Sequence, residues 1–321
     1  MDMKAVVVGG AGFIGSNLCD SLLRKKDDVI CIDNLSNGNK KNISELFLND
    51  DFTFYEGDAT DKTFLDRVFS KEKPDVVYHL AANSDIQASA SNPEVEYSNT
   101  YSTTFCILEC MRKHDIKKVF FASTSAVYGD KRGIELREDT ADLSPISYYG
   151  AAKLGSEALF HAYSYMNDLA VLVFRFPNVV GPRLTHGVIY DFIRKLDKNQ
   201  ETLNILGDGK QTKPYIYVKD LVDAIIDFTS DIKTGVEIYN LGVSGATSVR
   251  EIADIICGEL GLKDVRYEFT GGESGWKGDV PRFQYCLDKI QKMGWKAQYT
   301  SDEAVRETVR NVIKERKADV E

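Results

Sequence analysis

The chain has 321 residues, of which 43% are hydrophobic, and a formal net charge of −9. This length and apolar content are sufficient for one large domain and a smaller second one. The acidic balance excludes a broad basic surface of the kind that binds nucleic acid, so an anionic ligand needs local cations. The six cysteines are scattered without a Cys-x-x-Cys pair, which predicts core packing rather than disulfides or a metal site.

The start of the chain contains no basic leader, and no apolar stretch is long enough to span a membrane. The first apolar run instead enters a predicted strand at once. We therefore expect a cytoplasmic protein whose partners include neither a membrane nor a nucleic acid.

The first half of the chain alternates apolar runs with amphipathic segments. Such alternation is typical of right-handed βαβ crossovers and a parallel sheet. It predicts an α/β protein with a doubly wound, Rossmann-like sheet in a domain over residues 1–178, to which some later segments return. Strands are expected at 5–8, 29–32, 52–55, 76–80, 119–122 and 171–174, and helices near 13–25, 64–71, 95–114 and 149–167.

The second half has shorter and more mixed segments, which predict a smaller α/β lobe over residues 179–321. A turn is expected at Gly207-Asp208-Gly209, and Ser248 with Glu251 three residues later predicts a capped helix. We expect this lobe to hold the substrate. The other predicted elements are helices at 188–198 and 221–228 and strands at 203–206, 215–218 and 238–240.

Three glycines, Gly9, Gly12 and Gly15, follow the first strand and lead into a helix that opens near Phe13. A tight turn needs residues without Cβ, and a helix start offers N–H groups and a positive dipole end to a diphosphate. The second strand ends at Asp33, about 20 residues beyond the glycines, where a carboxylate can hold ribose hydroxyls. Since no arginine follows to accept a 2′-phosphate, the pattern favours NAD over NADP.

Tyr149 and Lys153 are four residues apart on a predicted helix, so both lie on one face. A nearby ammonium stabilises a phenolate and can bring its pKa toward neutrality. Ser123 and Thr124 end the strand before this helix and offer hydroxyls. A Tyr-x-x-x-Lys pair alone is common on solvated helices, but the glycine turn, acid, hydroxyl and Tyr/Lys pair occur here in one chain order.

In this combination the sequence resembles the extended short-chain dehydrogenase/reductase superfamily, and within it the nucleotide-sugar 4-epimerases of the UDP-galactose 4-epimerase type. The likeness covers nearly the whole chain. It is carried by Gly9-x-x-Gly12-x-x-Gly15, Asp33-Asn34-Leu35-Ser36, Gly57-Asp58, His79-Leu80-Ala81-Ala82, Asn99, Ser123-Thr124, Val127-Tyr128-Gly129, Tyr149-x-x-x-Lys153, Arg175 with Asn178, Gly181 and Pro182, the runs 207–212 and 215–218 with Asp220, Tyr239-Asn240-Leu241-Gly242, Gly278-Asp279 and Gly294-Trp295.

The resemblance implies a role for each matching position and a homodimer paired through the helices near 95–114 and 149–167. The implied catalytic residues are Thr124, Tyr149 and Lys153. The implied NAD-binding residues are Gly9, Gly12, Phe13, Ile14, Gly15, Asp33, Asn34, Ser36, Gly38, Asp58, Ala59, Leu80, Ala81, Ala82, Asn99, Ser123, Tyr149, Lys153 and Pro177. The implied UDP-sugar-binding residues are Ser84, Thr124, Asn178, Val188, Asn204, Leu206, Lys213, Tyr215 and Asp279.

Some positions depart from the family's pattern. Lys213 stands where the family often has an arginine that clamps the diphosphate, and a lysine keeps the charge without the bidentate fork. Ser84 stands where a lysine is sometimes found. The arginine expected near Asp279 is missing, and Lys277 or Arg282 is the candidate substitute.

The reaction is chosen by what surrounds the catalytic threonine. In the related 4,6-dehydratases an Asp-Glu pair directly follows the threonine. In the related decarboxylases an acid stands at the second position after it. This chain has Ser125 and Ala126 at these two positions. A reductase more often prefers NADPH, which Asp33 disfavours. The resemblance therefore implies an NAD-dependent UDP-glucose/UDP-galactose-type 4-epimerase acting through a transient 4-keto sugar. A UDP-N-acetylhexosamine, UDP-uronate or UDP-pentose epimerase, a reductase, and a non-catalytic NAD-binding module remain as alternatives.

Overall fold

The structure is a computed structural model that describes residues 3–83, 89–272, 278 and 280–318. The chain forms two compact units. We call Met1–Gly129, Asp142–Arg175 and Val222–Tyr239 the sheet unit, and Asp130–Ala141, Phe176–Leu221 and Asn240–Glu321 the C-terminal unit. The chain therefore enters the C-terminal unit briefly before the sheet unit is complete, and it returns to the sheet unit late.

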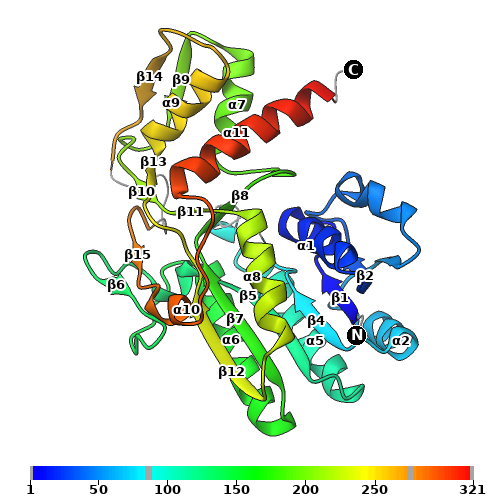
Figure 1. Cartoon of the computed structure of the whole chain (residues 1–321). Coiled ribbons are helices and arrows are strands. Elements are labelled where there is room, and N and C mark those ends of the chain that lie inside the picture. The colour runs from blue at the N-terminus through cyan, green and yellow to red at the C-terminus, as the bar shows by residue number, and fades with distance from the viewer. Residues whose placement is uncertain (1–2, 84–88, 273–277, 279, 319–321) are drawn as a thin grey trace. The chain divides into compact units, whose positions relative to one another are not determined.

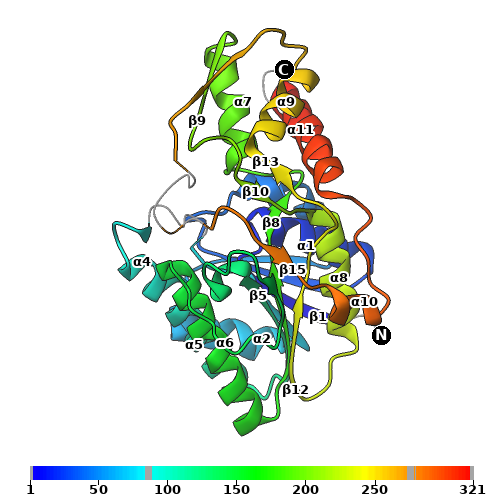
Figure 2. The ribbon, with the colours of Figure 1, turned by 90° about the vertical axis from the view of Figure 1, so that its left-hand side faces the viewer.

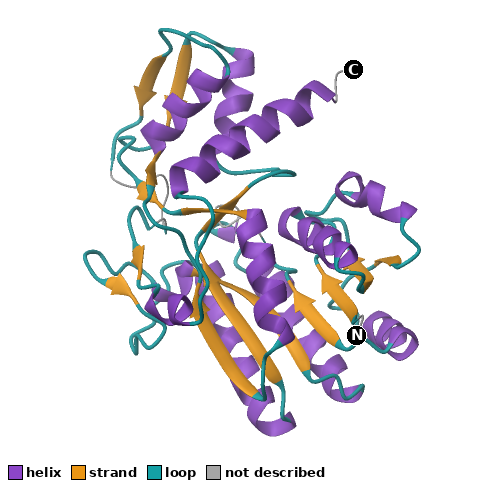
Figure 3. Ribbon diagram, in the orientation of Figure 1, coloured by secondary structure: helices purple, strands orange, loops and turns teal. Residues whose placement is uncertain are grey.

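The sheet unit contains a seven-stranded sheet in the order β12-β7-β5-β4-β1-β2-β3. Its strands are drawn in orange in Figure 3. β1 pairs in parallel with β2 and β4, so the strand order reverses at β1. This topology confirms the predicted doubly wound, Rossmann-like sheet. The strands are β1 (Lys4–Val8), β2 (Asp28–Asp33), β3 (Phe52–Glu56), β4 (Val76–His79), β5 (Lys118–Thr124), β7 (Ala170–Phe176) and β12 (Gly235–Asn240).

Helices cover both faces of this sheet, with α1 and α8 on one side and α2, α5 and α6 on the other (Figures 1 and 2). Apolar residues of every second strand position pack against α2, α5 and α6, and Phe160 and Phe121 lie at the centre of this core. The helices and single turns are α1 (Phe13–Arg24), η1 (Lys40–Leu48), α2 (Lys62–Glu72), α4 (Glu94–Glu96), η2 (Tyr97–Ser102), α5 (Thr103–Lys113), η3 (Ser125–Tyr128), α6 (Tyr148–Asn167) and α8 (Val218–Ser230).

The helix predicted over 95–114 is interrupted, because η2 is a π-helical turn between α4 and α5. Thr100 donates its hydroxyl to the carboxylate of Glu96 at 2.8 Å, and Thr103 donates to the carbonyl of Ser98 at 3.2 Å. Threonine hydroxyls that bond within their own helix compete with its regular pattern. Such π-turns occur frequently at functional sites.

Among its described residues, the C-terminal unit contains four two-stranded pairs, β8–β11, β9–β14, β10–β13 and β6–β15, and several helices. α7 has the predicted bounds, and the predicted Ser248–Glu251 capping box is present at the start of α9. The elements are β6 (Glu135–Leu136), β8 (Asn178–Val180), α7 (Val188–Lys198), β9 (Thr202–Ile205), β10 (Thr212–Lys213), β11 (Tyr215–Tyr217), β13 (Thr247–Ser248), α9 (Val249–Glu259), β14 (Arg266–Phe269), β15 (Gln284–Tyr285), α10 (Asp288–Lys292) and α11 (Ser301–Ala318).

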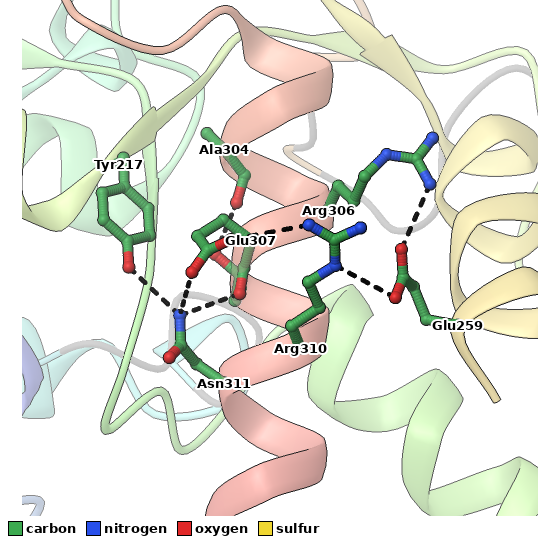
Figure 4. A network of polar contacts seen from close by, with 8 residues as sticks. Tyr217, Glu259, Ala304, Arg306, Glu307, Arg310 and Asn311 are labelled. Atoms are coloured by element: carbon green, nitrogen blue, oxygen red, sulfur yellow. Dashed lines mark hydrogen bonds and ion pairs between the residues drawn. The ribbon is translucent and has the colours of Figure 1, made fainter.

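The last helix, α11, is fixed to its own unit by polar contacts (Figure 4). Arg306 and Arg310 both bond to Glu259 of α9, at 3.3 and 3.1 Å. Asn311 donates to the hydroxyl of Tyr217 of β11 at 3.1 Å. α11 thereby joins α9 to β11 within the C-terminal unit.

All six cysteines are buried free thiols, as the sequence predicts. Within the described ranges, no helix combines the length and apolar character needed to cross a bilayer. No cluster of His, Cys, Asp and Glu suited to a metal ion occurs in that same part of the chain.

Candidate active site

The glycine turn between β1 and α1 lies where the strand order reverses. Gly9 has a φ of +84°, and a Cβ there would lie 2.7 Å from the backbone nitrogen of Ala81. A Cβ on Gly15 would collide with the carbonyl oxygen of Gly9, so both positions require glycine. α1 begins at Phe13 after Gly12, with no side-chain cap and no acidic residue in its first turn. The turn and the helix start therefore fit a diphosphate.

Asp33 ends β2 and is 8% exposed. Its Oδ2 accepts a hydrogen bond from the N–H of Ala11 at 2.9 Å, and its Oδ1 accepts one from the N–H of Leu35 at 2.8 Å. Desolvation raises the pKa of Asp33, while the backbone N–H groups oppose this rise. A Cβ on Gly38 would lie 2.6 Å from Oδ1. The carboxylate thus holds the glycine turn in place, which the sequence argument did not anticipate.

The residues predicted to surround the adenosine follow the neighbouring strands β2 and β3. Asn34 donates its side-chain amide to Asp58 at 3.0 Å and accepts the hydroxyl of Ser36 at 2.7 Å. Ala59, the residue after Asp58, is buried. The structure therefore brings Asn34, Ser36 and Asp58 into one polar cluster.

The residues predicted to line the middle of the cofactor occupy three elements. Leu80–Ala82 follow β4, and the N–H of Leu80 donates to the carbonyl of Val8 at 2.9 Å, which places this segment beside the glycine turn. Phe13 and Ile14 form the half-buried start of α1. Asn99 is exposed on the π-turn η2.

The predicted catalytic residues lie together at the carboxyl end of β5. Tyr149 and Lys153 are one turn apart on α6, and Thr124 is the last residue of β5. The hydroxyl of Thr124 acts on Tyr149 and lowers its pKa. Lys153 is 2% exposed, its Nζ donates to the carbonyl of Ala122 at 2.7 Å, and it lies 5.8 Å from the ring centre of Tyr149.

The charges around this pair differ from the expectation for Tyr149. Desolvation raises its pKa, the carboxylate of Glu96 adds to the rise, and the hydroxyl of Thr124 opposes it. Desolvation also lowers the pKa of Lys153 to about 8, although Glu96 and Glu157 act in the opposite direction. The residues of the chain therefore shift the pKa of Tyr149 upward, because desolvation and Glu96 outweigh the effect of Thr124.

Two buried carboxylates near Lys153 were not predicted. Glu96 is 2% exposed and accepts hydrogen bonds from the amide of Asn83 and the hydroxyl of Thr100, both at 2.8 Å. No sequence signal separates it from the exposed Glu94. Glu157 lies on α6 and accepts the hydroxyl of Ser123. Its position one turn after Lys153 on the same helix face is a signal that could have identified it.

Several residues predicted to bind the UDP-sugar lie in the C-terminal unit. Asn178 and Tyr215 are register partners on β8 and β11, and Tyr215 is buried. Pro177, predicted to contact the cofactor, is buried just before β8. Lys213 is half-buried on β10, opposite Thr247 of β13.

The residues predicted for the uracil side gather around α7 and β9. Val188 is the first residue of α7, after Gly187 with φ of +94°. Asn204 and Leu206 are exposed, and Lys195 donates to the carbonyl of Asn204 at 3.1 Å. The predicted turn at 207–209 is present, with positive φ at both of its glycines.

The remaining predicted positions are Ser84, Asp279 and Lys277, which lie outside the described residues. Arg282 is exposed and donates to the carbonyl of Lys210 at 3.5 Å. This contact keeps Arg282 beside the turn that precedes Lys213.

A family model described as "NAD dependent epimerase/dehydratase family" matches residues 5–242. The chain belongs to this family. NAD is accordingly its cofactor, and the glycine turn, the uncapped start of α1 and Asp33 are the features that fit it.

The putative UDP-glucose 4-epimerase of Methanocaldococcus jannaschii is 35% identical over 313 residues, which cover 95% of this chain and 96% of the relative. A crystal structure of UDP-galactose 4-epimerase has a TM-score of 0.86 at 36% identity and covers 98% of this chain and 99% of the other. DesIV, a dTDP-glucose 4,6-dehydratase from Streptomyces venezuelae with NAD and TYD bound, has a TM-score of 0.89 at 28% identity over 98% of both chains. The fold alone therefore does not separate epimerisation from dehydration.

Proposed function

We propose that the protein is an NAD-dependent 4-epimerase of a UDP-sugar, with UDP-glucose and UDP-galactose as its substrate pair. The names of the relative from Methanocaldococcus jannaschii and of the UDP-galactose 4-epimerase structure support this choice of reaction and sugar. UDP-N-acetylhexosamines, UDP-uronates and UDP-pentoses are the other sugars that the same reaction would serve.

One observation carries the proposal of epimerisation over dehydration. The hydroxyl of Thr124 lowers the pKa of Tyr149, while the next two residues, Ser125 and Ala126, start η3 and carry no carboxylate. Dehydration at C5 and C6 needs further acid and base groups beside the catalytic hydroxyl. Glu96 and Glu157, whose charges act on Lys153, are both buried and hydrogen-bonded to their neighbours.

The mechanism follows from the positions of three side chains. Tyr149 is the group that takes the proton of the sugar 4-hydroxyl and returns it, and Thr124 aligns that hydroxyl. Lys153 supplies the positive charge that favours the phenolate, since its Nζ lies 5.8 Å from the ring centre of Tyr149. NAD, when bound, accepts the hydride of C4 and gives it back.

The sheet unit is proposed to bind NAD through the residues at the carboxyl ends of its strands. The C-terminal unit is proposed to anchor the nucleotide through Asn178, Lys213 and Tyr215, with Val188, Asn204 and Leu206 at the uracil. Ser84 and Asp279 belong to the same proposal on the resemblance alone. An anchored nucleotide leaves the sugar able to present either face.

A second copy of the chain is the proposed partner. Tyr97 is 63% exposed and stacks on Tyr101, and Phe105 of α5 is 36% exposed. Tyr165 and Met166 at the end of α6 are 88% and 75% exposed. Such apolar groups along two adjoining helices favour a homodimer through α5 and α6. The free cysteines favour a reducing compartment, and we propose the cytoplasm.

A panel of UDP-sugars tests the proposed function. The purified protein is incubated with each sugar without added reductant, and the products are separated and identified. The expected result is interconversion at C4 with no net change in NAD. A 4-keto-6-deoxy product would identify a dehydratase, and consumption of NAD(P)H in proportion to product would identify a reductase.

A further inference from the structure

Four buried polar side chains, Ser123, Tyr128, Glu157 and Arg175, bond to one another; we call them the Glu157 network. Nε and Nη2 of Arg175 donate to the two carboxylate oxygens of Glu157 at 3.1 and 2.7 Å. Nη1 of Arg175 donates to the hydroxyl of Tyr128 at 3.0 Å, and Ser123 donates its hydroxyl to Glu157. Glu157 and Arg175 are 3% and 2% exposed, so the whole network lies inside the sheet unit.

The network adjoins each residue of the proposed catalytic set. Glu157 follows Lys153 by one turn of α6 and Tyr149 by two, so the three share one helix face. Ser123 directly precedes Thr124 in β5. The guanidinium comes from β7, so the network bonds α6 to both of these strands. A shift of α6 along the strands would break these bonds and separate Tyr149 from Thr124.

The charges that face Lys153 come from several elements. Glu96 of α4 and Glu157 of α6 raise its pKa, and desolvation lowers it. Tyr149 lies one turn before it on α6. His79 of β4 is fully buried, and desolvation together with the charge of Lys153 lowers its pKa, which leaves it neutral. The two carboxylates are therefore the groups that favour the ammonium.

The guanidinium of Arg175 makes the charge of Glu157 matter more. Arginine stays protonated in proteins. Without the carboxylate, a second cation would remain buried in the same low-dielectric region as Lys153 and would repel its ammonium. Glu157 therefore attracts the ammonium of Lys153 and also neutralises the guanidinium of Arg175.

We propose that Glu157 and Arg175 are positioning residues, which hold α6 against β5 and β7 and keep the ammonium of Lys153 charged beside Tyr149. This inference rests on the proposed function where it concerns turnover. The charge state of Lys153 is a separate observable that does not depend on which sugar is converted.

The test compares Glu157→Gln with a matched control, Glu109→Gln. Glu109 of α5 accepts hydrogen bonds from Nε and Nη2 of Arg112, at 3.0 and 3.1 Å, and from the hydroxyl of Tyr163 at 2.6 Å. Like Glu157, it is therefore bonded to an arginine and a hydroxyl, but at a more exposed place in the sheet unit. Each protein is labelled with ¹³C at the lysine side chains and titrated by NMR. The resonance of Lys153 is assigned by its loss in Lys153→Met.

We expect Lys153 to titrate at least about one pH unit lower in Glu157→Gln than in the parent, and at the parent's value in Glu109→Gln. Turnover of the UDP-sugar should then fall roughly fivefold near pH 8 and much less near pH 6, since the protonated fraction drops from about one half to about one tenth near pH 8. The Michaelis constant should change little. A purely structural role would lower turnover equally at both pH values.

The double variant Glu157→Gln/Arg175→Met removes the guanidinium together with the carboxylate, so no unpaired cation stays buried. It tests the inference if the single variant does not fold. In the double variant, the pKa of Lys153 should lie between its value in the parent and its value in Glu157→Gln. If only the double variant is obtained, the pKa should lie below that of the parent. A Lys153 titration equal to the parent's in these variants would overturn the inference. If the parent converts no UDP-sugar, the proposed function fails, while the titration still decides the role of Glu157.

Discussion

Replacing Lys153 with methionine should stabilise the sheet unit at neutral pH while abolishing turnover. The side chain is 2% exposed, and its pKa is lowered from 10.5 to about 8. This difference corresponds to about 3 kcal/mol in favour of the neutral amine in the folded chain. Losing the hydrogen bond to the carbonyl of Ala122 costs about 1 kcal/mol. We therefore expect the free energy of unfolding to rise by about 2 kcal/mol near pH 7.

The sign of this effect depends on pH in a defined way. Below about pH 8 the lysine is protonated in both the folded and the unfolded chain, so the parent carries the full penalty. Between about pH 8 and 10.5 the unfolded chain holds the proton and the folded chain does not. The parent therefore gains stability as the pH rises through this window, and the advantage of Lys153→Met shrinks.

Urea unfolding followed by circular dichroism near pH 7 and near pH 10 measures both parts of this prediction. Lys117 of the same unit is a suitable control, because it is exposed and its Nζ donates to the carbonyl of Asn167 at 3.0 Å. Lys117→Met should show no gain that disappears at the higher pH. The reasoning is refuted if Lys153→Met is less stable than the parent near pH 7, or if its advantage is the same at both pH values.

Substitutions at three further residues address the cofactor, the base and the anchor. Asp33→Ala should weaken the binding of NAD and narrow the preference for NAD over NADP, as measured by calorimetry. The N–H groups of Ala11 and Leu35 lose a buried acceptor in this variant, at a cost of about 1–3 kcal/mol each. Equal affinity of the parent for both cofactors would contradict this prediction. Tyr149→Phe should lower turnover about a hundredfold and retain NAD binding; retained turnover would remove Tyr149 from the mechanism. Lys213→Ala should raise the Michaelis constant more than it lowers turnover, and Lys213→Arg should be tolerated. Unchanged constants in the alanine variant would move the search for the diphosphate cation to Lys277 and Arg282.

The sheet was predictable because its signal is local. Apolar runs such as 29–32 and 119–122 leave few alternatives to a buried parallel strand, and the structure extends them by only one or two residues at each end. The capping box at Ser248 and the bounds of α7 follow from short-range chemistry in the same way. Where neighbouring residues along the chain decide the structure, the sequence is sufficient.

The elements that were missed depend on partners far away in the sequence. β8, β10 and β13 have only two or three residues each and exist through their pairing with distant strands. α11 did carry a signal, since Ala304, Val305, Thr308, Val309 and Val312 recur at helical spacing and are buried. The many charged residues on the other face of α11 obscured this apolar pattern in the sequence.

At the catalytic site the sequence identified the groups but not their electrostatic surroundings. The four-residue spacing of Tyr149 and Lys153 predicted that both lie on one helix face, and in the structure both lie one turn apart on α6. The spacing could not show the desolvation that raises the pKa of Tyr149, or the buried Glu96 that adds to it. Both effects come from tertiary packing around α6, so the sequence alone could not show them.

The Glu157–Arg175 pair illustrates the same limit and also why it matters. A glutamate on a helix is most often solvated, yet Glu157 is 3% exposed and is bonded by both Nε and Nη2 of Arg175. Replacing a buried ion pair with well-packed apolar side chains is often neutral or stabilising by about 1–4 kcal/mol. Stability alone therefore does not explain why Glu157, one turn after Lys153 on α6, forms a buried ion pair with Arg175 of β7. Their charge and their fixed geometry are what an apolar pair could not supply, and both act on the residues that carry the proposed chemistry.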